Sequence, residues 1–140
     1  SIFFLEGEGL EWRLSPMADT IEEEIGNFLL SLHRQFEEKR DFLKVVLERM
    51  IIDTTLKEKV DASIARRVLQ NLQDRLLKMR ERGLVRTDVD LEKVSLSILS
   101  YSFSISGTIK LVANFDESYL ISTINEFSRY ISRGLSPLPA

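Results

Sequence analysis

Proline distribution constrains the fold of this chain more than any other feature of its sequence. The chain has 140 residues, and its three prolines are Pro16, Pro137 and Pro139. Because proline lacks a backbone N–H and clashes with the preceding helical turn, it ends or kinks a helix. The proline-free range 17–136 can therefore form long helices. We predict an all-α body over 17–136, between an irregular arm over 1–16 and a tail over 137–140.

Apolar residues recur at three- and four-residue steps, the spacing of one face of an α-helix. These stripes predict a helix over about 17–40, a long helix over about 56–82 and a final helix after Asp116 that ends before Gly134. Between the first two, Asp41 can cap a shorter helix; a single helix continuing through this position is the alternative. With the stretch described next, we expect a bundle of about five main helices.

The stretch 91–113 contains two conflicting patterns. Serine alternates with larger residues over 100–106, which is the period of a β-strand. Helical spacing gives the same stretch two apolar faces, one containing Ile98 and the other Leu99, and no other segment offers a partner strand. We therefore predict a helix buried on two sides. Its serines would allow close helix packing, which we favour over the alternative that they present hydroxyls to a small molecule.

Composition excludes several classes of function. The chain has no cysteine and a single histidine, His33, so thiolate metal sites, disulfides and cysteine nucleophiles are impossible. We expect no catalytic residues, no metal and no cofactor. A net charge of −3 does not suit a nucleic-acid binder. No run approaches the ~20 apolar residues of a membrane span, so we expect no membrane contact and a cytoplasmic location.

His33 is the one residue whose role stays open. It lies beside the apolar stripe of the first helix, where it could donate to a bound ligand or titrate near neutral pH. A histidine at such a position is more often a boundary residue of the core, and we favour that interpretation. The acidic groups at helix starts are interpreted as caps and dipole partners rather than as acid–base pairs.

The junction 78–94 has the residues of a helix end, a tight turn and a helix start. Gly83 can adopt the positive φ that a helix exit needs. Either Asp88 or Asp90 can cap the next helix, with Glu92 in its first turn. We predict a helix–turn–helix-pair junction here.

The run Arg-Glu-Arg-Gly-Leu-Val-Arg-Thr-Asp-Val-Asp over 80–90 closely resembles a turn in the TetR family of transcriptional regulators, between the family's seventh and eighth helices. The closing run Tyr-Ile-Ser-Arg-Gly-Leu over 130–135 is similar to the end of that family's final helix. The resemblance covers about 56–135, the regulatory domain, while the family's N-terminal DNA-binding segment is missing. It implies an effector-binding and dimerisation domain that reaches DNA only through an upstream domain absent from this chain.

By this resemblance, a pocket for a small apolar or amphipathic effector would lie between the helices over 17–40, 56–82 and 91–113. Effector binding would then control DNA affinity of a full-length protein. The expected wall residues are Phe28, Leu32, Phe36, Leu69, Leu72, Leu76, Ser97 and Tyr101. A helical homodimerisation or protein-interaction module without a small ligand is the alternative.

The resemblance also implies that the last two helices pair with their copies in a second chain as a four-helix bundle. The two apolar faces of 91–113 support a homodimer independently, because they offer more apolar surface than one small domain can cover. The expected interface residues are Ile98, Ser102, Ile105, Ile109, Leu120, Ile124, Phe127 and Ile131.

Overall fold

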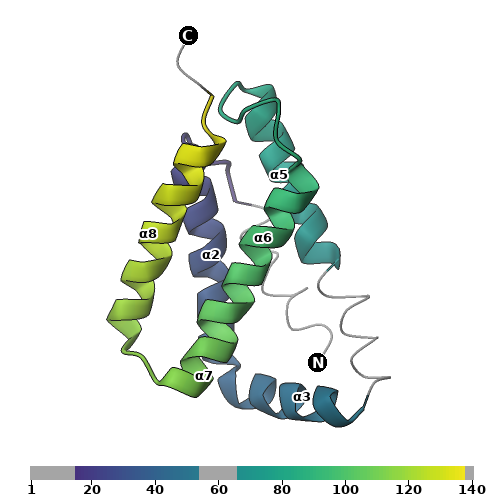
Figure 1. Ribbon diagram of the computed structural model, residues 1–140, viewed down its shortest axis with the longest axis vertical. Helices are drawn as coiled ribbons and strands as arrows, with labels where there is room; N and C mark the ends of the chain where they lie inside the picture. Colours follow the sequence, from purple (N-terminus) through teal and green to yellow (C-terminus); the bar gives the residue numbers. More distant parts are fainter. Residues whose placement is uncertain (1–14, 54–65, 138–140) are drawn as a thin grey trace.

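The computed structural model describes residues 15–53 and 66–137, which are helical apart from the short connections (Figure 1). The elements are α2 (Ile21–Glu38), α3 (Arg40–Ile52), α5 (Arg66–Glu81), α6 (Leu91–Phe103), the π-helix η2 (Ser104–Thr108), α7 (Ile109–Ala113) and α8 (Glu117–Leu135). These two ranges contain no strand, which confirms the all-α prediction. The predictions for the arm over 1–14, for the helix start over 54–65 and for the last three residues lie outside the described residues.

The first predicted helix is shorter than expected and separate from the second. Thr20 caps α2 by accepting a hydrogen bond from the backbone N–H of Glu23 at 3.1 Å. Lys39 then leaves the helical conformation, with φ −116° and ψ 24°, and α3 begins at the next residue. The prediction of a separate, shorter second helix is confirmed, and the alternative of one continuous helix is wrong. The predicted cap at Asp41 is also wrong, because the cap position is Lys39, two residues earlier.

The junction after α5 has the predicted geometry. Gly83 has a φ of +79°, and the N–H groups of Leu84 and Gly83 donate to the carbonyls of Met79 and Arg80 at 3.0 and 2.9 Å. This bond pair is a Schellman motif, which satisfies carbonyls left free at a helix end. Of the two predicted caps, Asp88 and Asp90, the structure has Asp90. Its side chain accepts hydrogen bonds from the backbone N–H groups of Glu92 and Lys93 in the first turn of α6.

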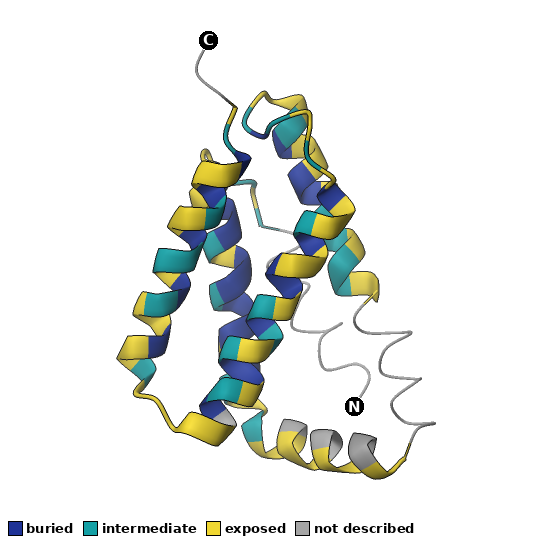
Figure 2. Ribbon diagram, in the orientation of Figure 1, coloured by how far each residue is buried: buried dark blue, intermediate teal, exposed yellow. Residues whose placement is uncertain are grey.

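The central helix of the fold is α2. α8 packs along one side of it, the pair α5 and α6 lies against the other side, and α3 crosses one end (Figure 1). The buried residues face inward on α2, α5, α6 and α8 (Figure 2). Each large apolar side chain in such a core contributes about 1.5–3 kcal/mol by leaving water. The most completely buried apolar side chains are Ile25, Phe28, Leu29, Leu72, Leu76, Met79, Ile98, Leu120 and Ile124.

The predicted helix over 91–113 exists but contains a π turn in the serine-rich stretch. Ile109 donates its N–H to the carbonyl of Ser104, five residues earlier, so α6, η2 and α7 form one interrupted helix. The last helix continues through Gly134 to Leu135, and the prediction that it ends before Gly134 was wrong. The carbonyl of Leu135 accepts from Arg86 at 2.8 Å, which joins the end of α8 to the junction loop.

Candidate polar site between α2 and α8

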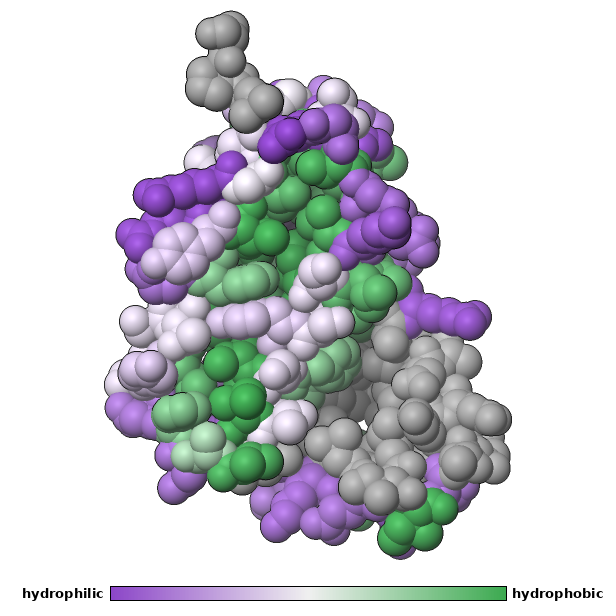
Figure 3. Space-filling model, viewed as in Figure 1, coloured by the Kyte–Doolittle hydropathy of each residue, from purple (hydrophilic) through white to green (hydrophobic). Residues whose placement is uncertain are grey.

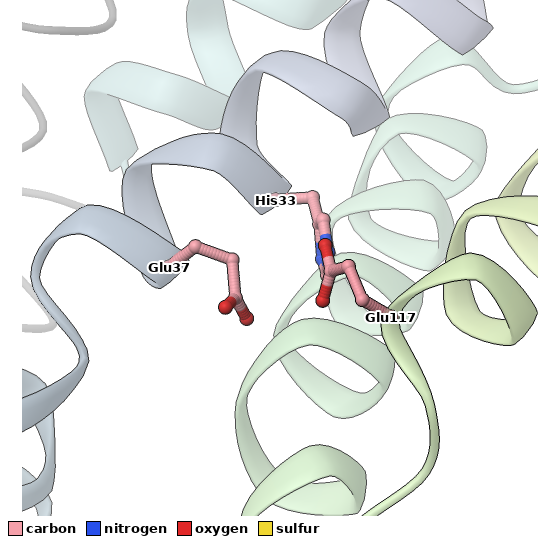
Figure 4. Close-up of side chains that lie close together, drawn as sticks. All are labelled: His33, Glu37 and Glu117. Atoms are coloured by element: carbon pink, nitrogen blue, oxygen red, sulfur yellow. The ribbon is translucent and has the colours of Figure 1, made fainter.

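A cluster of ionisable side chains joins α2 to the start of α8. His33 and Glu37 lie one turn apart on α2, and Glu117 is the first residue of α8 (Figure 4). Lys110 of α7 and Ser106 of the π-helix complete the cluster. We call these five residues the His33 cluster. It brings together groups up to 84 positions apart in the chain.

Both nitrogens of His33 are hydrogen-bonded, and its side chain is only 3% exposed. Nε2 lies 2.6 Å from Oε1 of Glu117, and Nδ1 lies 2.7 Å from Oγ of Ser106. Because an ionised carboxylate can only accept, Nε2 carries the proton and donates to Glu117. In the neutral ring Nδ1 then accepts from the hydroxyl of Ser106. The imidazole is therefore fixed in one tautomer between α8 and the π-helix.

The ammonium group of Lys110 lies between the two carboxylates of the cluster. Nζ donates to Oε1 of Glu37 at 2.5 Å and also bonds to Oε2 of Glu117. Arg40 adds a second cation to Glu37. Two positive charges therefore balance the two carboxylates, which offsets the cost of burying part of each charged group.

The acidic members of the cluster are held in their ionised form. Burial raises the pKa of Glu117, but hydrogen bonds from Lys110 and His33 outweigh it, so the pKa lies below the ordinary value. For Glu37, burial likewise raises the pKa, and the bonds from Lys110 and Arg40 lower it by more. Both carboxylates thus stay charged at neutral pH and remain strong acceptors.

The π turn explains how Ser106 and Lys110 reach this site. Ile98, Ser102, Ser106 and Lys110 are all buried, at steps of four residues. In an α-helix of 3.6 residues per turn, a four-residue step drifts by about 40° around the axis. The wider π turn absorbs this drift and keeps the later residues facing α2. Such turns are frequent at functional positions in helices.

The cluster borders a cleft along the outer side of α2. The cleft has a volume of about 670 Å³, and its walls include Leu30, Arg34 and Ile121 beside His33, Glu37 and Glu117. The carboxylates of the cluster are therefore reachable from solvent, while the imidazole behind them is buried. This arrangement can bind a cation or a small polar group at the cleft wall.

The expected effector-pocket residues divide into two groups. Phe28, Leu32, Phe36, Leu72 and Leu76 are buried together in the core, and Leu69 and Tyr101 pack against it half-buried. Ser97 is apart from them: it is exposed, and its hydroxyl donates to the carbonyl of Lys93 at 2.9 Å. None of the eight is among the walls of the cleft beside α2.

The residues expected at the dimer interface differ in how far they are buried. Ile98, Ser102, Leu120 and Ile124 are buried inside the chain itself, so they face its own core and not its surface. Ile105, Ile109, Phe127 and Ile131 are half-exposed. The resemblance and the apolar faces gave all eight as one set, because periodicity does not distinguish the centre of a buried face from its edge.

Sequence reasoning considered two members of the cluster: it favoured a boundary role for His33 and a packing role for the serines that include Ser106. Glu37 follows His33 by four residues, a spacing that places both side chains on one helix face. That pair was the available signal. Lys110 and Glu117 gave no signal, and nothing in the sequence connected Ser106 with His33, because their approach depends on the π turn and on the packing of α8.

No family model, no curated protein and no solved structure matches this chain. The similarity to the TetR family therefore rests on the two short runs that carry it. Within the described ranges, no helix combines the length and apolar character needed to cross a bilayer.

Proposed function

We propose that this chain is the effector-sensing and dimerising domain of a transcriptional regulator similar to the TetR family. The observation that carries this proposal is an apolar outer face formed by α6 and α8. Apolar side chains gather between these two helices on the face seen in the space-filling view (Figure 3). The resemblance places the pairing helices of such regulators in this part of the chain.

The face has an ordered aromatic centre and exposed aromatic edges. Tyr101 of α6 stacks on Phe127 of α8, with ring centroids 3.7 Å apart, and its hydroxyl donates to the carbonyl of Thr123 at 3.3 Å. Tyr119 and Tyr130 are each 59% exposed. Aromatic residues of this kind are enriched at protein interfaces. A large apolar face on a small chain is costly in water, which favours a partner there.

A second copy of the chain is the occupant we propose. Two-fold pairing places the same surface of both copies in contact, so α6 and α8 of each chain would form a four-helix bundle. Exposed positions on this side include Ser97 and Ser100 of α6 and Ser104 at the start of η2, whose small side chains permit close approach of a partner helix. Ile105, Ile109, Phe127 and Ile131 would then be covered.

Effector binding is the second part of the proposal. A small apolar or amphipathic molecule would bind among α2, α5 and α6 and favour one arrangement of the helices over another. An upstream DNA-binding domain would respond to this shift. The binding of DNA thus belongs to a longer protein and not to this chain, whose net charge is −3.

The dimer is tested by sedimentation equilibrium at micromolar concentration. We expect a dimer for the native sequence and a dissociation constant at least tenfold higher for Tyr130→Glu, because the new charge would enter an apolar interface. Leu77→Glu is the control, since Leu77 is an exposed apolar residue on α5. A monomeric native chain, or equal weakening by both variants, contradicts the proposal.

A homodimerisation module without an effector is the second candidate. It is favoured by the dense burial of Phe28, Leu72 and Leu76 in one continuous core. A thermal-shift screen with medium-chain carboxylic acids separates the two functions. Saturable stabilisation that is lost in Leu72→Trp supports sensing; a dimer that no such compound stabilises supports the module.

A further inference from the structure

We infer that His33, Glu37 and Glu117 form a binding site for a divalent transition-metal ion, in which the metal takes the place of the Lys110 ammonium. This goes beyond the proposed function and does not depend on it. One ligand atom from each residue lies within 4.8 Å of the other two. Bonds of about 2.0–2.2 Å place the ligands of one ion roughly 3–4.4 Å apart, so small side-chain rotations bring the three atoms into range.

The set of donor atoms selects the class of metal. One imidazole and two carboxylates suit Zn²⁺, Mn²⁺ or Fe²⁺, whereas Ca²⁺ and Mg²⁺ prefer oxygen ligands alone. The three residues lie in the wall of the cleft beside α2. The cleft provides an entry path, and water from it can fill the remaining coordination positions.

Ser106 supplies the outer contact that a metal-binding histidine requires. Such histidines use one nitrogen for the metal and donate the other N–H to a polar group, which fixes the ring. Nε2 of His33 points at Glu117, and Nδ1 lies 2.7 Å from Oγ of Ser106. With a metal on Nε2, the ring would take the other tautomer, with its proton on Nδ1, and this N–H would donate to the Ser106 oxygen after a rotation of the hydroxyl and without movement of the backbone.

Lys110 marks the position where positive charge is held. Its ammonium lies between the same two carboxylate groups that would bind the metal. The lysine side chain is long and flexible, so it can leave toward solvent when a divalent ion binds. Lys110 therefore competes with the metal, and its removal leaves two carboxylates with only Arg40 to offset them.

The test is isothermal titration of the full 140-residue chain with ZnCl₂ after removal of metal by EDTA. We expect one zinc per chain and an increase in melting temperature on binding. Lys110→Met should bind at least tenfold more tightly, and His33→Asn at least tenfold more weakly. Glu38→Gln is the matched control, because Glu38 lines the same cleft but lies outside the cluster.

Three results overturn the inference, provided that circular dichroism shows each variant folded. The first is no zinc binding by the native chain, even if Lys110→Met binds zinc, because the lysine would then be a permanent replacement for the ion. The second is unchanged binding by His33→Asn, and the third is equal weakening by Glu38→Gln. Oligomeric state measured in EDTA tests the proposed dimer separately, so the two proposals can fail independently.

Discussion

Helix α2 carries two polar sites that differ in how they meet water. Near its start, Glu24 is completely buried and forms a forked pair with Arg75 of α5, with Nε 2.6 Å from Oε1 and Nη2 3.2 Å from Oε2. Arg75 also donates to the carbonyls of Ser15 and Pro16. This site is closed to water, and its hydrogen bonds hold the residues that precede α2 against α5.

The His33 cluster, further along α2, is open on one side. The carboxylates of Glu37 and Glu117 are 29% and 43% exposed, and they share their cation, Lys110. Burial makes an unpaired charge costly, whereas water can replace a lost partner at an exposed one. The comparison indicates that losing a partner costs more at the Glu24–Arg75 pair than at the His33 cluster, where water can reach the carboxylates.

The sharpest test of this contrast is Arg75→Met. Because Glu24 would remain buried without its partner, we expect a loss of about 3–5 kcal/mol in the free energy of unfolding. The double variant Glu24→Leu with Arg75→Met should recover most of this loss, since no charge is then buried. Urea denaturation measures both. Arg66→Met, an exposed change on the same helix, is the control; a similar loss there would remove the contrast.

His33→Ala should have the next largest effect. The change removes two hydrogen bonds and a buried ring, and it leaves the hydroxyl of Ser106 without a partner, so we expect a loss of about 1–3 kcal/mol. The same denaturation experiment measures this loss in the presence of EDTA. A loss as large as that of Arg75→Met would show that the His33 cluster is as closed as the Glu24 site.

Lys110→Met in EDTA should destabilise the chain by about 1 kcal/mol or less, because water reaches both carboxylates that it leaves behind. Equilibrium unfolding of this variant beside the native chain provides the measurement. If Lys110→Met lowered the free energy of unfolding as much as Arg75→Met, the replacement of Lys110 by a metal ion would be too unfavourable to occur.

Acidification should produce the smallest effect. The pKa values of Glu37 and Glu117 lie below the ordinary value of 4.5 in the folded chain. Their ionised forms therefore stabilise the fold above about pH 4.5, and this contribution is lost as the pH falls through the lowered pKa. Unfolding curves from pH 7 to pH 3 for the native chain and Glu117→Gln should converge at the acidic end. If the stabilities of the two proteins instead diverged toward low pH, the predicted direction of the pH dependence would be wrong.

Much of the fold followed from local signals. The proline-free range, the helical stripes and the cap at Asp90 predicted the helices because each depends on neighbours within a few residues. Gly83 was predictable for the same reason, since only its own φ mattered. The break between α2 and α3 was predicted but placed two residues too late, at Asp41 instead of Lys39. The π turn inside the serine-rich stretch was missed, because no local residue signals it.

The candidate site was much less predictable. His33 and Glu37 share a helix face at a spacing visible in the sequence, but Glu117 comes from a helix that begins 80 residues later than Glu37. The division of the pairing stripe into buried and exposed members also depended on tertiary packing: α8 packs on α2, and Leu120 and Ile124 of α8 are fully buried.

The sequence by itself determined the all-helical character of the described ranges, the approximate positions of the main helices and the tight junction at Gly83, because these follow from interactions within one or two helical turns. Tertiary structure alone decided which charged groups meet. The packing of α8 on α2 brings Glu117 to His33, and the π turn directs Ser106 and Lys110 to the same place. Such contacts join residues far apart in the chain, and no local pattern contains the information that they require.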